Sequence, residues 1–208
     1  MSAFGSGLSA LAIGAHPDDV EFGCFGSLQR FDTRRIVVMS AGEAGGPQEQ
    51  RRAEADEAAG AIDAELTVLG LADTQLSVPA VIDEITAAIE RTNPDVIFTL
   101  SALDTHQDHA AVGRAALVAL RRFRGLVFAY PSPSLAPANF APQTFLEVDE
   151  ASQAKKMLAL DAHRSQAHRH YLGTDYLETV SRYWAHQAGA GFEWCEPFEL
   201  VRWTAGRE

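Results

Sequence analysis

Short apolar runs alternate with helix-forming segments through the first 130 residues, and this alternation limits the possible folds more than any other feature. Strands are predicted at 8–15, 35–39, 65–69, 96–100 and 125–130, with helices at 21–31, 49–61, 77–91 and 110–122. Continuous β-branched runs such as RIVVM and VIFTL are typical of strands covered on both faces. Because strands that alternate with helices pair in parallel, we predict an α/β fold with an open, mostly parallel sheet flanked by helices.

The remaining residues continue this pattern less regularly. A strand is expected at 144–148, helices at 149–160 and 171–186, and a terminal strand at 198–203. A chain of 208 residues can bury one self-sufficient core. We therefore predict a single domain over residues 1–208, with the core in about 8–148 and packing elements in about 149–208.

Charge and cysteine content narrow the classes of partner and compartment. Acidic residues outnumber basic ones by 28 to 17, which gives a formal net charge of −11. Such a chain repels phosphate backbones and anionic lipids, so neither nucleic acid nor a membrane is an expected partner. The N-terminal residues show neither a basic segment nor a long apolar run, which argues against a signal peptide. Two distant cysteines, Cys24 and Cys195, indicate a reduced, cytoplasmic setting.

The segment Ala15–Glu21 (AHPDDVE) places an imidazole and three carboxylates directly after the first predicted strand. Side chains adjacent in sequence point in different directions, so one aspartate can bind a cation while its neighbour faces a water on that cation. The pattern favours half of a hydrolytic metal site, with His16 and Asp19 as ligands and Asp18 as the general base.

A second polar cluster, Asp104 to His109, follows the strand predicted at 96–100. Ligands of open parallel sheets bind outside the carboxyl ends of the strands, so function is expected where these clusters lie. His109 would complete a zinc site of two imidazoles, one carboxylate and an open position for water. Asp108 is expected to reach back to His106 and hold that imidazole in its protonated form, able to stabilise an oxyanion and protonate a leaving amine.

The two clusters together resemble those of the PIG-L/LmbE-like zinc-dependent N-deacetylases, through AHPDDVE at 15–21 and HQDHAA at 106–111. Smaller similarities are Gly42-Glu43, the helix pattern of Arg51, Glu54 and Ala58, the turn from Leu69 to Asp73, His163 with Ser165 and Gln166, and Glu196-Pro197-Phe198. The resemblance implies a Rossmann-like fold and hydrolysis of N-acetyl groups from glucosamine-containing substrates. It also implies zinc on His16, Asp19 and His109, Asp18 as base, His106 as charged electrophile and acid, Asp108 as its orienting partner, and substrate contacts from Arg51 and Asp73.

From these features we predict a metal-dependent hydrolase that removes an N-acetyl group from an amino sugar or a GlcNAc-containing conjugate and releases acetate. Zinc is the expected metal, and the same ligands also accept Fe(II). Two other classes stay open: a non-haem Fe(II) oxygenase, whose facial triad is also two histidines and a carboxylate, and a non-catalytic protein that binds sugar or metal. The sequence determines neither the sugar, the aglycone and the pathway nor the oligomeric state, for which a homo-oligomer is one option.

Overall fold

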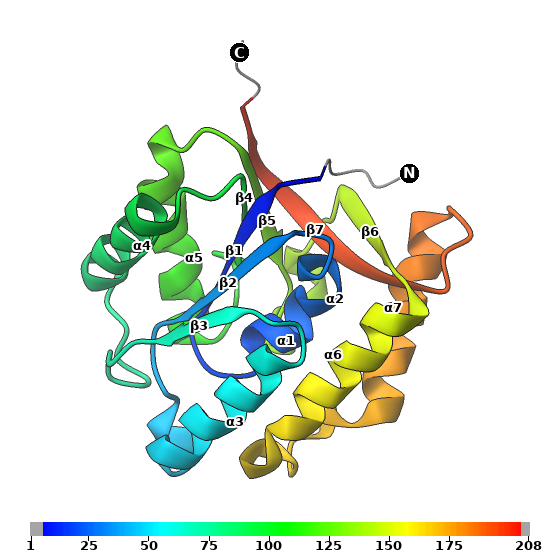
Figure 1. The fold of residues 1–208 in the computed structure, drawn as a ribbon, viewed down its shortest axis with the longest axis horizontal. Coiled ribbons are helices and arrows are strands. Elements are labelled where there is room, and N and C mark those ends of the chain that lie inside the picture. Colours follow the sequence, from blue (N-terminus) through cyan, green and yellow to red (C-terminus); the bar gives the residue numbers. More distant parts are fainter. Residues whose placement is uncertain (1–5, 205–208) are drawn as a thin grey trace.

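The computed structural model describes residues 6–204, which form a seven-stranded sheet with helices on both faces (Figure 1). The strands are β1 (Ser9–Gly14), β2 (Thr33–Val38), β3 (Glu65–Val68), β4 (Val96–Leu100), β5 (Leu126–Tyr130), β6 (Thr144–Val148) and β7 (Trp194–Trp203). The α-helices are α1 (Asp19–Gly23), α2 (Phe25–Leu28), α3 (Gln48–Gly60), α4 (Val78–Thr92), α5 (Gln107–Ala119), α6 (Glu150–Ala162) and α7 (Thr174–Ala188). Within the described range, no helix is both long and apolar enough to cross a membrane.

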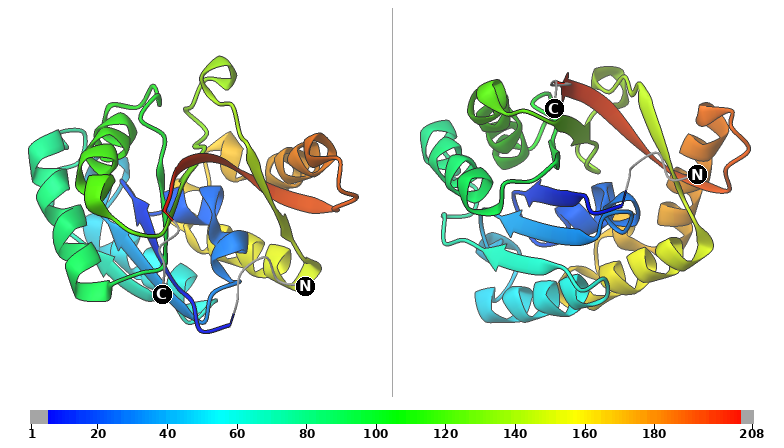
Figure 2. Two further views of the ribbon diagram at one scale, coloured as in Figure 1. Left: turned by 90° about the horizontal axis from the view of Figure 1, so that it is seen from above. Right: turned by 45° about the horizontal axis from the view of Figure 1, so that its top comes forward.

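The strand order in the sheet is β3-β2-β1-β4-β5-β7-β6. The first five strands are parallel, whereas β7 runs antiparallel to both β5 and β6. The chain moves outward from β1 to β3 and then returns to add β4 on the other side of β1. Helices α1 to α3 and α6 consequently cover one face, and α4 and α5 cover the other (Figures 1 and 2). The predicted Rossmann-like fold with a mostly parallel, helix-flanked sheet is confirmed.

The centre of the sheet forms the hydrophobic core because both of its faces are covered there. All residues of β4 are buried, as are residues 10–13 of β1. Helix α4 buries Val81, Ile85 and Ala88, which lie on one face of the helix because of their spacing. This packed centre fixes the carboxyl ends of β1 and β4, from which the two polar clusters emerge.

Several helix ends differ from the sequence prediction by one to three residues, and two differences affect the polar clusters. The helix predicted at 21–31 is interrupted at Cys24, between α1 and α2. Helix α5 begins at Gln107 instead of residue 110, so Asp108 and His109 lie in its first turn. The cause is an unusual N-cap: His106 Nδ1 accepts the backbone N–H of Asp108 at 3.3 Å, a role that Ser, Thr, Asp or Asn usually fills.

The C-terminal segment takes part in the sheet as well as packing beside it. β7 starts at Trp194, earlier than predicted, and lies between β5 and β6. On the helical side, Leu160 of α6 and Leu177 of α7 pack against Phe22 of α1. These contacts hold the segment 163–173, which connects α6 to α7 through the short 3-10 helices Arg164–Gln166 and His170–Leu172, near the loop that follows β1.

A close approach of α5 to the loop after β4 requires glycine at position 113. A Cβ at Gly113 would lie 2.5 Å from the backbone N of Ala102 and 2.6 Å from the backbone C of Ser101. Backbone atoms cannot rotate away from a clash as a side chain can. We therefore expect Gly113→Ala to lower the free energy of unfolding by about 1–3 kcal/mol, measured by urea denaturation. Gly60→Ala is the matched control, since a Cβ there meets nothing within 4 Å. Equal stability of the two variants would contradict this packing.

Candidate active site

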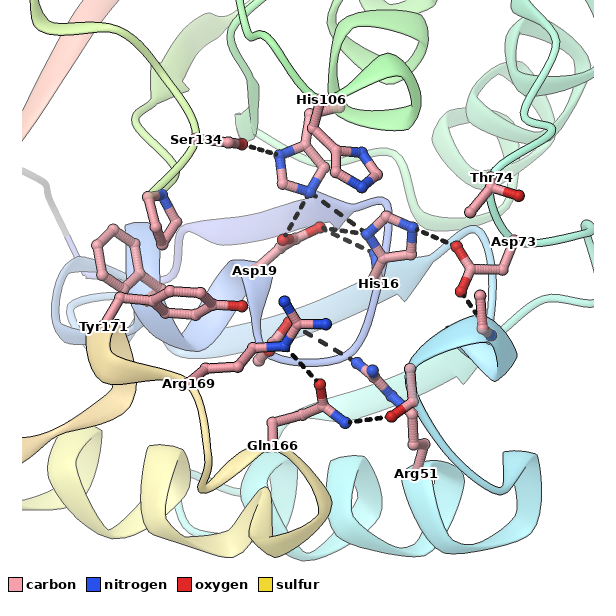
Figure 3. A pocket seen from close by; sticks show the side chains of 16 residues that line it. His16, Asp19, Arg51, Asp73, Thr74, His106, Ser134, Gln166, Arg169 and Tyr171 are labelled. Atoms are coloured by element: carbon pink, nitrogen blue, oxygen red, sulfur yellow. Dashed lines mark hydrogen bonds and ion pairs between the residues drawn. The ribbon is translucent and has the colours of Figure 1, made fainter.

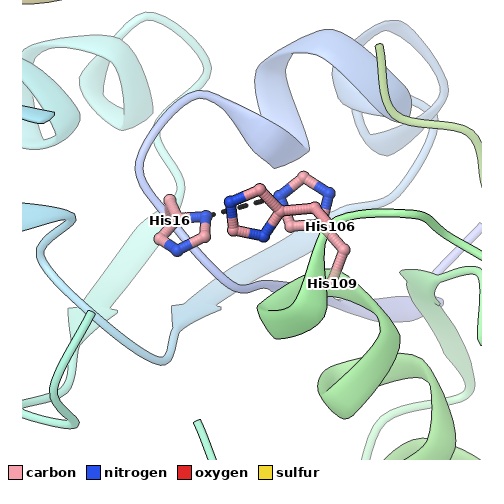
Figure 4. A group of neighbouring side chains, drawn as sticks. All are labelled: His16, His106 and His109. Carbon is pink, nitrogen blue, oxygen red and sulfur yellow. Dashed lines mark hydrogen bonds between the residues drawn. The ribbon is translucent and has the colours of Figure 1, made fainter. Parts of the chain in front are cut away.

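The two polar clusters meet at the point where the strand order reverses. β1 and β4 are neighbours, although β2 and β3 come between them along the chain, so their carboxyl ends flank the crevice in which such sheets bind ligands. His16 and Asp19 follow β1, whereas His106 and His109 follow β4. Their side chains point toward one another (Figures 3 and 4).

Three donor atoms, His16 Nδ1, His109 Nε2 and Asp19 Oδ1, form what we call the donor triangle. His109 Nε2 lies 3.1 Å from Asp19 Oδ1 and 3.3 Å from His16 Nδ1. A zinc ion with bonds of ~2.0–2.2 Å separates its tetrahedral ligands by roughly 3.3 Å, so these two distances suit such an ion. Asp19 and His16 lie less close together, with Asp19 Oδ2 at 3.8 Å from His16 Nδ1. Ring nitrogens of His16, His106 and His109 also lie close enough together to hold an ion. The ring of His106 lies alongside, with its centroid 4.5 Å from that of His109 (Figure 4).

His109 is held on its far side by a buried carboxylate. Its Nδ1 lies 3.1 Å from Asp104 Oδ2, and Asp104 accepts hydrogen bonds from the hydroxyl groups of Ser132 and Ser134. An imidazole that donates Nδ1–H to a carboxylate presents the lone pair of Nε2 on the other side. This arrangement is usual for histidines that bind metal.

Asp19 and His16 are fixed in a comparable way. Asp19 Oδ2 accepts the backbone N–H groups of Ala15 and His16 at 2.9 and 2.8 Å, which leaves Oδ1 for the donor triangle. His16 Nε2 lies 2.9 Å from Asp73 Oδ1 and 3.1 Å from Asp108 Oδ2. The nitrogen of His16 that faces the triangle is therefore Nδ1. All three donors thus have an outer partner that sets their orientation.

Asp104→Asn tests the importance of the outer contact to His109. The amide keeps the size of the side chain but removes the charge that favours Nδ1–H, so zinc affinity is expected to fall by about 10–100-fold. Competition with a chromogenic chelator measures this affinity. Asp161→Asn, at an exposed position on α6, should leave it unchanged. Wild-type affinity in the Asp104 variant would show that the contact does not support metal binding.

The structure corrects the expected pairing of Asp108 with His106. Asp108 accepts the backbone N–H groups of Thr74 at 2.7 Å and Leu76 at 3.2 Å, in addition to its contact with His16. Residues two positions apart on a helix do not face each other, so the carboxylate turns toward the loop after β3. Its link to His106 is the backbone N–H that this ring caps. Asp108 therefore orients His16.

The surroundings of His106 also disfavour the charged form that the sequence predicts. Burial and the neighbouring rings of His109 and His16 lower the pKa of His106. With Nδ1 accepting the Asp108 N–H, the neutral ring carries its proton on Nε2. The neutral His106 ring can thus donate a hydrogen bond from Nε2 to a ligand without becoming an imidazolium cation.

Asp18 occupies a strained backbone position beside the donor triangle. Its φ of 103° lies in a region that L-residues rarely adopt, and such strain is concentrated at functional sites. The side chain is buried, and its Oδ1 lies 3.9 Å from Arg51 Nη2. Burial and the Asp19 carboxylate raise the pKa of Asp18 to about 6. Such a group can accept and return a proton near neutral pH.

The electrostatic environment of the donor triangle favours positive charge. Burial by itself would lower the pKa of both histidines, but the surrounding carboxylates raise that of His16 to about 9 and that of His109 to about 10. Burial would raise the pKa of Asp19, yet the two histidines bring it well below its usual range. A divalent cation competes with protons for the same atoms and is favoured by the same charges. Donor type, spacing and charge therefore fit a metal ion.

The donor triangle opens into a cavity of about 230 Å³. Its lining comprises His16, Asp18, Asp19, Phe22, Ala44, Gly45, Arg51, Asp73, Thr74, His106, His109, Pro133, Ser134, Gln166, Arg169 and Tyr171. Arg51 and Asp73, the expected substrate contacts, both lie in this lining, and each also has a protein partner: Arg51 donates to the Pro17 carbonyl at 2.7 Å, and Asp73 accepts the Ala44 N–H at 2.9 Å. Because pockets for drug-sized ligands are typically about 300–1,000 Å³, this cavity suits a small molecule or the end of a larger one.

The sequence interpretation missed several residues of this site. Asp104 carries a usable signal, since it lies two positions before His106 in the same polar cluster. Ser132 carries none, because a serine after a strand is common in any loop. Arg169 and Tyr171 belong to the irregular segment 163–173, where no periodicity indicates which side chains face the cavity.

Comparison with known proteins identifies the family. Residues 11–120 match the family described as PIG-L: GlcNAc-PI de-N-acetylase. The uncharacterized deacetylase YaiS of Escherichia coli (strain K12) is 36% identical over 168 residues, which cover 74% of this chain and 90% of that protein. The chain belongs to the PIG-L family. The matched range contains all three residues of the donor triangle, and the resemblance carried by the two clusters is confirmed.

Solved structures resemble this PIG-L chain over nearly its whole length. GalB, the 4-carboxy-2-hydroxymuconate hydratase of Pseudomonas putida KT2440, has a TM-score of 0.80 at 18% identity, covering 97% of this chain and 99% of that chain. The N,N'-diacetylchitobiose deacetylase of Pyrococcus horikoshii has a TM-score of 0.73 at 19% identity, covering 92% and 83%. Since one fold serves two reactions, the function of this chain must be argued from its own residues.

Proposed function

We propose that this PIG-L family member is a zinc-dependent N-deacetylase that removes the acetyl group from a small N-acetyl amino sugar or a conjugate of one and releases acetate. The observation that carries the proposal is the donor triangle beside a buried Asp18 whose pKa is raised to about 6. The description of the family supports the reaction class. The name of a structural relative, N,N'-diacetylchitobiose deacetylase, supports an amino sugar as the carrier of the acetyl group.

In the proposed mechanism His16, Asp19 and His109 hold the ion. Zinc at this position would polarise the amide carbonyl and lower the pKa of a water molecule. Asp18 takes a proton from the attacking water onto its carboxylate. His106 donates Nε2–H to the carbonyl oxygen as negative charge develops there. Asp18 then gives its proton to the leaving nitrogen, and burial, which raises the pKa of this carboxyl, helps it to hold the proton between the two transfers.

Arg51 and Asp73 are proposed to contact the sugar. Both line the cavity, and Arg51 Nε is buried with no hydrogen-bond partner among the described residues. A buried donor of this kind is costly unless a ligand satisfies it. Phe22 and Tyr171 add aromatic surface to the same lining, which suits the apolar face of a sugar ring.

The sheet and the cysteines support two further proposals, on domain organisation and on location. We propose that residues 1–208 act as a single domain, since β7 completes the sheet that the earlier strands begin. We also propose a cytoplasmic location, because Cys24 and Cys195 are both free and buried.

Acetate release tests the proposed reaction. The panel consists of N-acetylglucosamine, its glycosides and N-acetylated pseudo-disaccharides, and zinc content is measured on the same preparation. We expect acetate release that scales with bound zinc, disappears on chelation and returns when zinc is restored. No acetate from any compound at full zinc occupancy would contradict the proposal.

The same experiment separates the competing functions. Hydration of a carbon–carbon double bond, the kind of reaction named for GalB, releases no acetate. Activity that needs iron and disappears without O2 would favour an Fe(II) oxygenase. Binding of an N-acetyl sugar without turnover would favour a non-catalytic role.

A further inference from the structure

Arg169 lies in the cavity wall without an acidic partner. Its Nε donates a hydrogen bond to Gln166 Oε1 at 2.8 Å. Arg51, the other arginine of the cavity lining, has Asp18 Oδ1 at 3.9 Å, whereas among residues 6–204 no carboxylate oxygen lies within 4.0 Å of Arg169. Its guanidinium group points into the cavity (Figure 3). The terminal nitrogens, which carry four N–H groups, are therefore available to a ligand.

The guanidinium group of Arg169 is also held in place before any ligand arrives. Gln166, which anchors it, is fully buried and donates to the Gly45 carbonyl at 3.1 Å. The ring of Tyr171 lies on another side, with its centroid 5.9 Å from Arg169 Cζ. An arginine fixed by neutral partners loses less conformational entropy when it binds a ligand.

A second guanidinium group shares this wall, because position 45 has no side chain. A Cβ at Gly45 would lie 2.6 Å from Arg51 Nη1 and 3.6 Å from Arg169 Nη2. Arg51 is compensated by Asp18 at 3.9 Å. The charge of Arg169 has no such compensation in a chain whose net charge is −11. Arg169 thus adds to this wall a positive charge that no carboxylate contacts directly.

We propose that Arg169 binds an anionic group of the substrate, a carboxylate or a phosphate, so that the preferred substrate is an acidic N-acetyl compound and not a neutral sugar. The planar guanidinium fork matches both anions through paired hydrogen bonds. The inference rests on the proposed deacetylase function and specifies its substrate class. Arg169 determines specificity and takes no part in metal binding or proton transfer.

Calorimetric binding to the zinc-loaded protein tests this role without depending on turnover. The probes are matched amines: glucosamine against glucosamine 6-phosphate, and glucosamine against muramic acid, which carries a carboxylate. We expect at least one acidic probe to bind about 10–100-fold more tightly than glucosamine, and Arg169→Gln to remove that preference. The probe that is preferred distinguishes phosphate from carboxylate. Arg164→Gln is the matched control, because Arg164 belongs to the same segment, is exposed and pairs with Glu57 at 2.6 Å.

The inference would be overturned if the wild-type protein bound neither acidic probe or preferred neither to glucosamine. It would also be overturned if the preference survived in Arg169→Gln, or if Arg164→Gln lost it to the same extent. These results can be distinguished from results that would reject the proposed deacetylase function. Acetate release from neutral sugars with no anion preference would reject only the role of Arg169. A preference that depends on Arg169, found in a protein that releases no acetate, would reject only the deacetylase.

Discussion

Asp18→Asn is expected to lower kcat for acetate release by about 10²–10⁴-fold while zinc remains bound. The amide cannot take a proton from water, whereas the donor triangle does not include Asp18. Asparagine is chosen because it keeps the size of the side chain and tolerates positive φ better than other non-glycine residues that cannot act as a base, and φ at this position is 103°. Acetate release and zinc content measured on one preparation give both quantities.

The matched control for this variant is Asp56→Asn, an exposed carboxylate on α3. It removes the same charge from the chain and should leave kcat and zinc content unchanged. Near-normal turnover in Asp18→Asn would reject Asp18 as the base. Loss of zinc together with activity would instead place Asp18 among the groups that bind the metal.

His109→Gln is expected to abolish stoichiometric zinc binding and, with it, detectable acetate release. His109 Nε2 makes both of the shortest contacts in the donor triangle, at 3.1 and 3.3 Å, and Gln offers no imidazole nitrogen to replace it. Because an ion that binds only the folded state raises Tm, added zinc should stabilise the wild-type protein and not this variant. Metal analysis and thermal unfolding with and without zinc measure the two effects.

His168→Gln is the control for loss of an imidazole, since His168 is exposed and lies outside the cavity lining. Its zinc content and zinc-dependent Tm should equal those of the wild-type protein. If His109→Gln kept one tightly bound zinc per chain, His109 could not be a required ligand.

The proximity of the two polar clusters could be predicted from the sequence because it depends on the topology of the sheet. Parallel strands joined by helices place their carboxyl ends at one edge of the sheet, and β1 and β4 become neighbours when the chain returns to the centre. His16, Asp19 and His109 follow those two strands. Their separation along the chain therefore does not prevent them from meeting.

The partner of Asp108 could not be predicted, because it depends on where one helix begins. The His106 ring caps α5 and starts the helix early, which turns Asp108 toward His16. Arg169 shows a second limit. Its position depends on the packing of α6 and α7 against Phe22, a long-range contact that no local pattern in the segment 163–173 encodes. The insertion of β7 between β5 and β6 is non-local in the same sense.

An anomalous difference map recorded at the zinc edge from zinc-loaded crystals tests the central claim most directly. One peak is expected within about 2.0–2.3 Å of His16 Nδ1, His109 Nε2 and Asp19 Oδ1. Two other sets of donors lie close enough together to hold an ion: His16 with His106 and His109, and, on the far side of His16, its Nε2 with Asp73 and Asp108. A peak at either of these sets, with none at the donor triangle, would contradict metal binding by His16, Asp19 and His109 together.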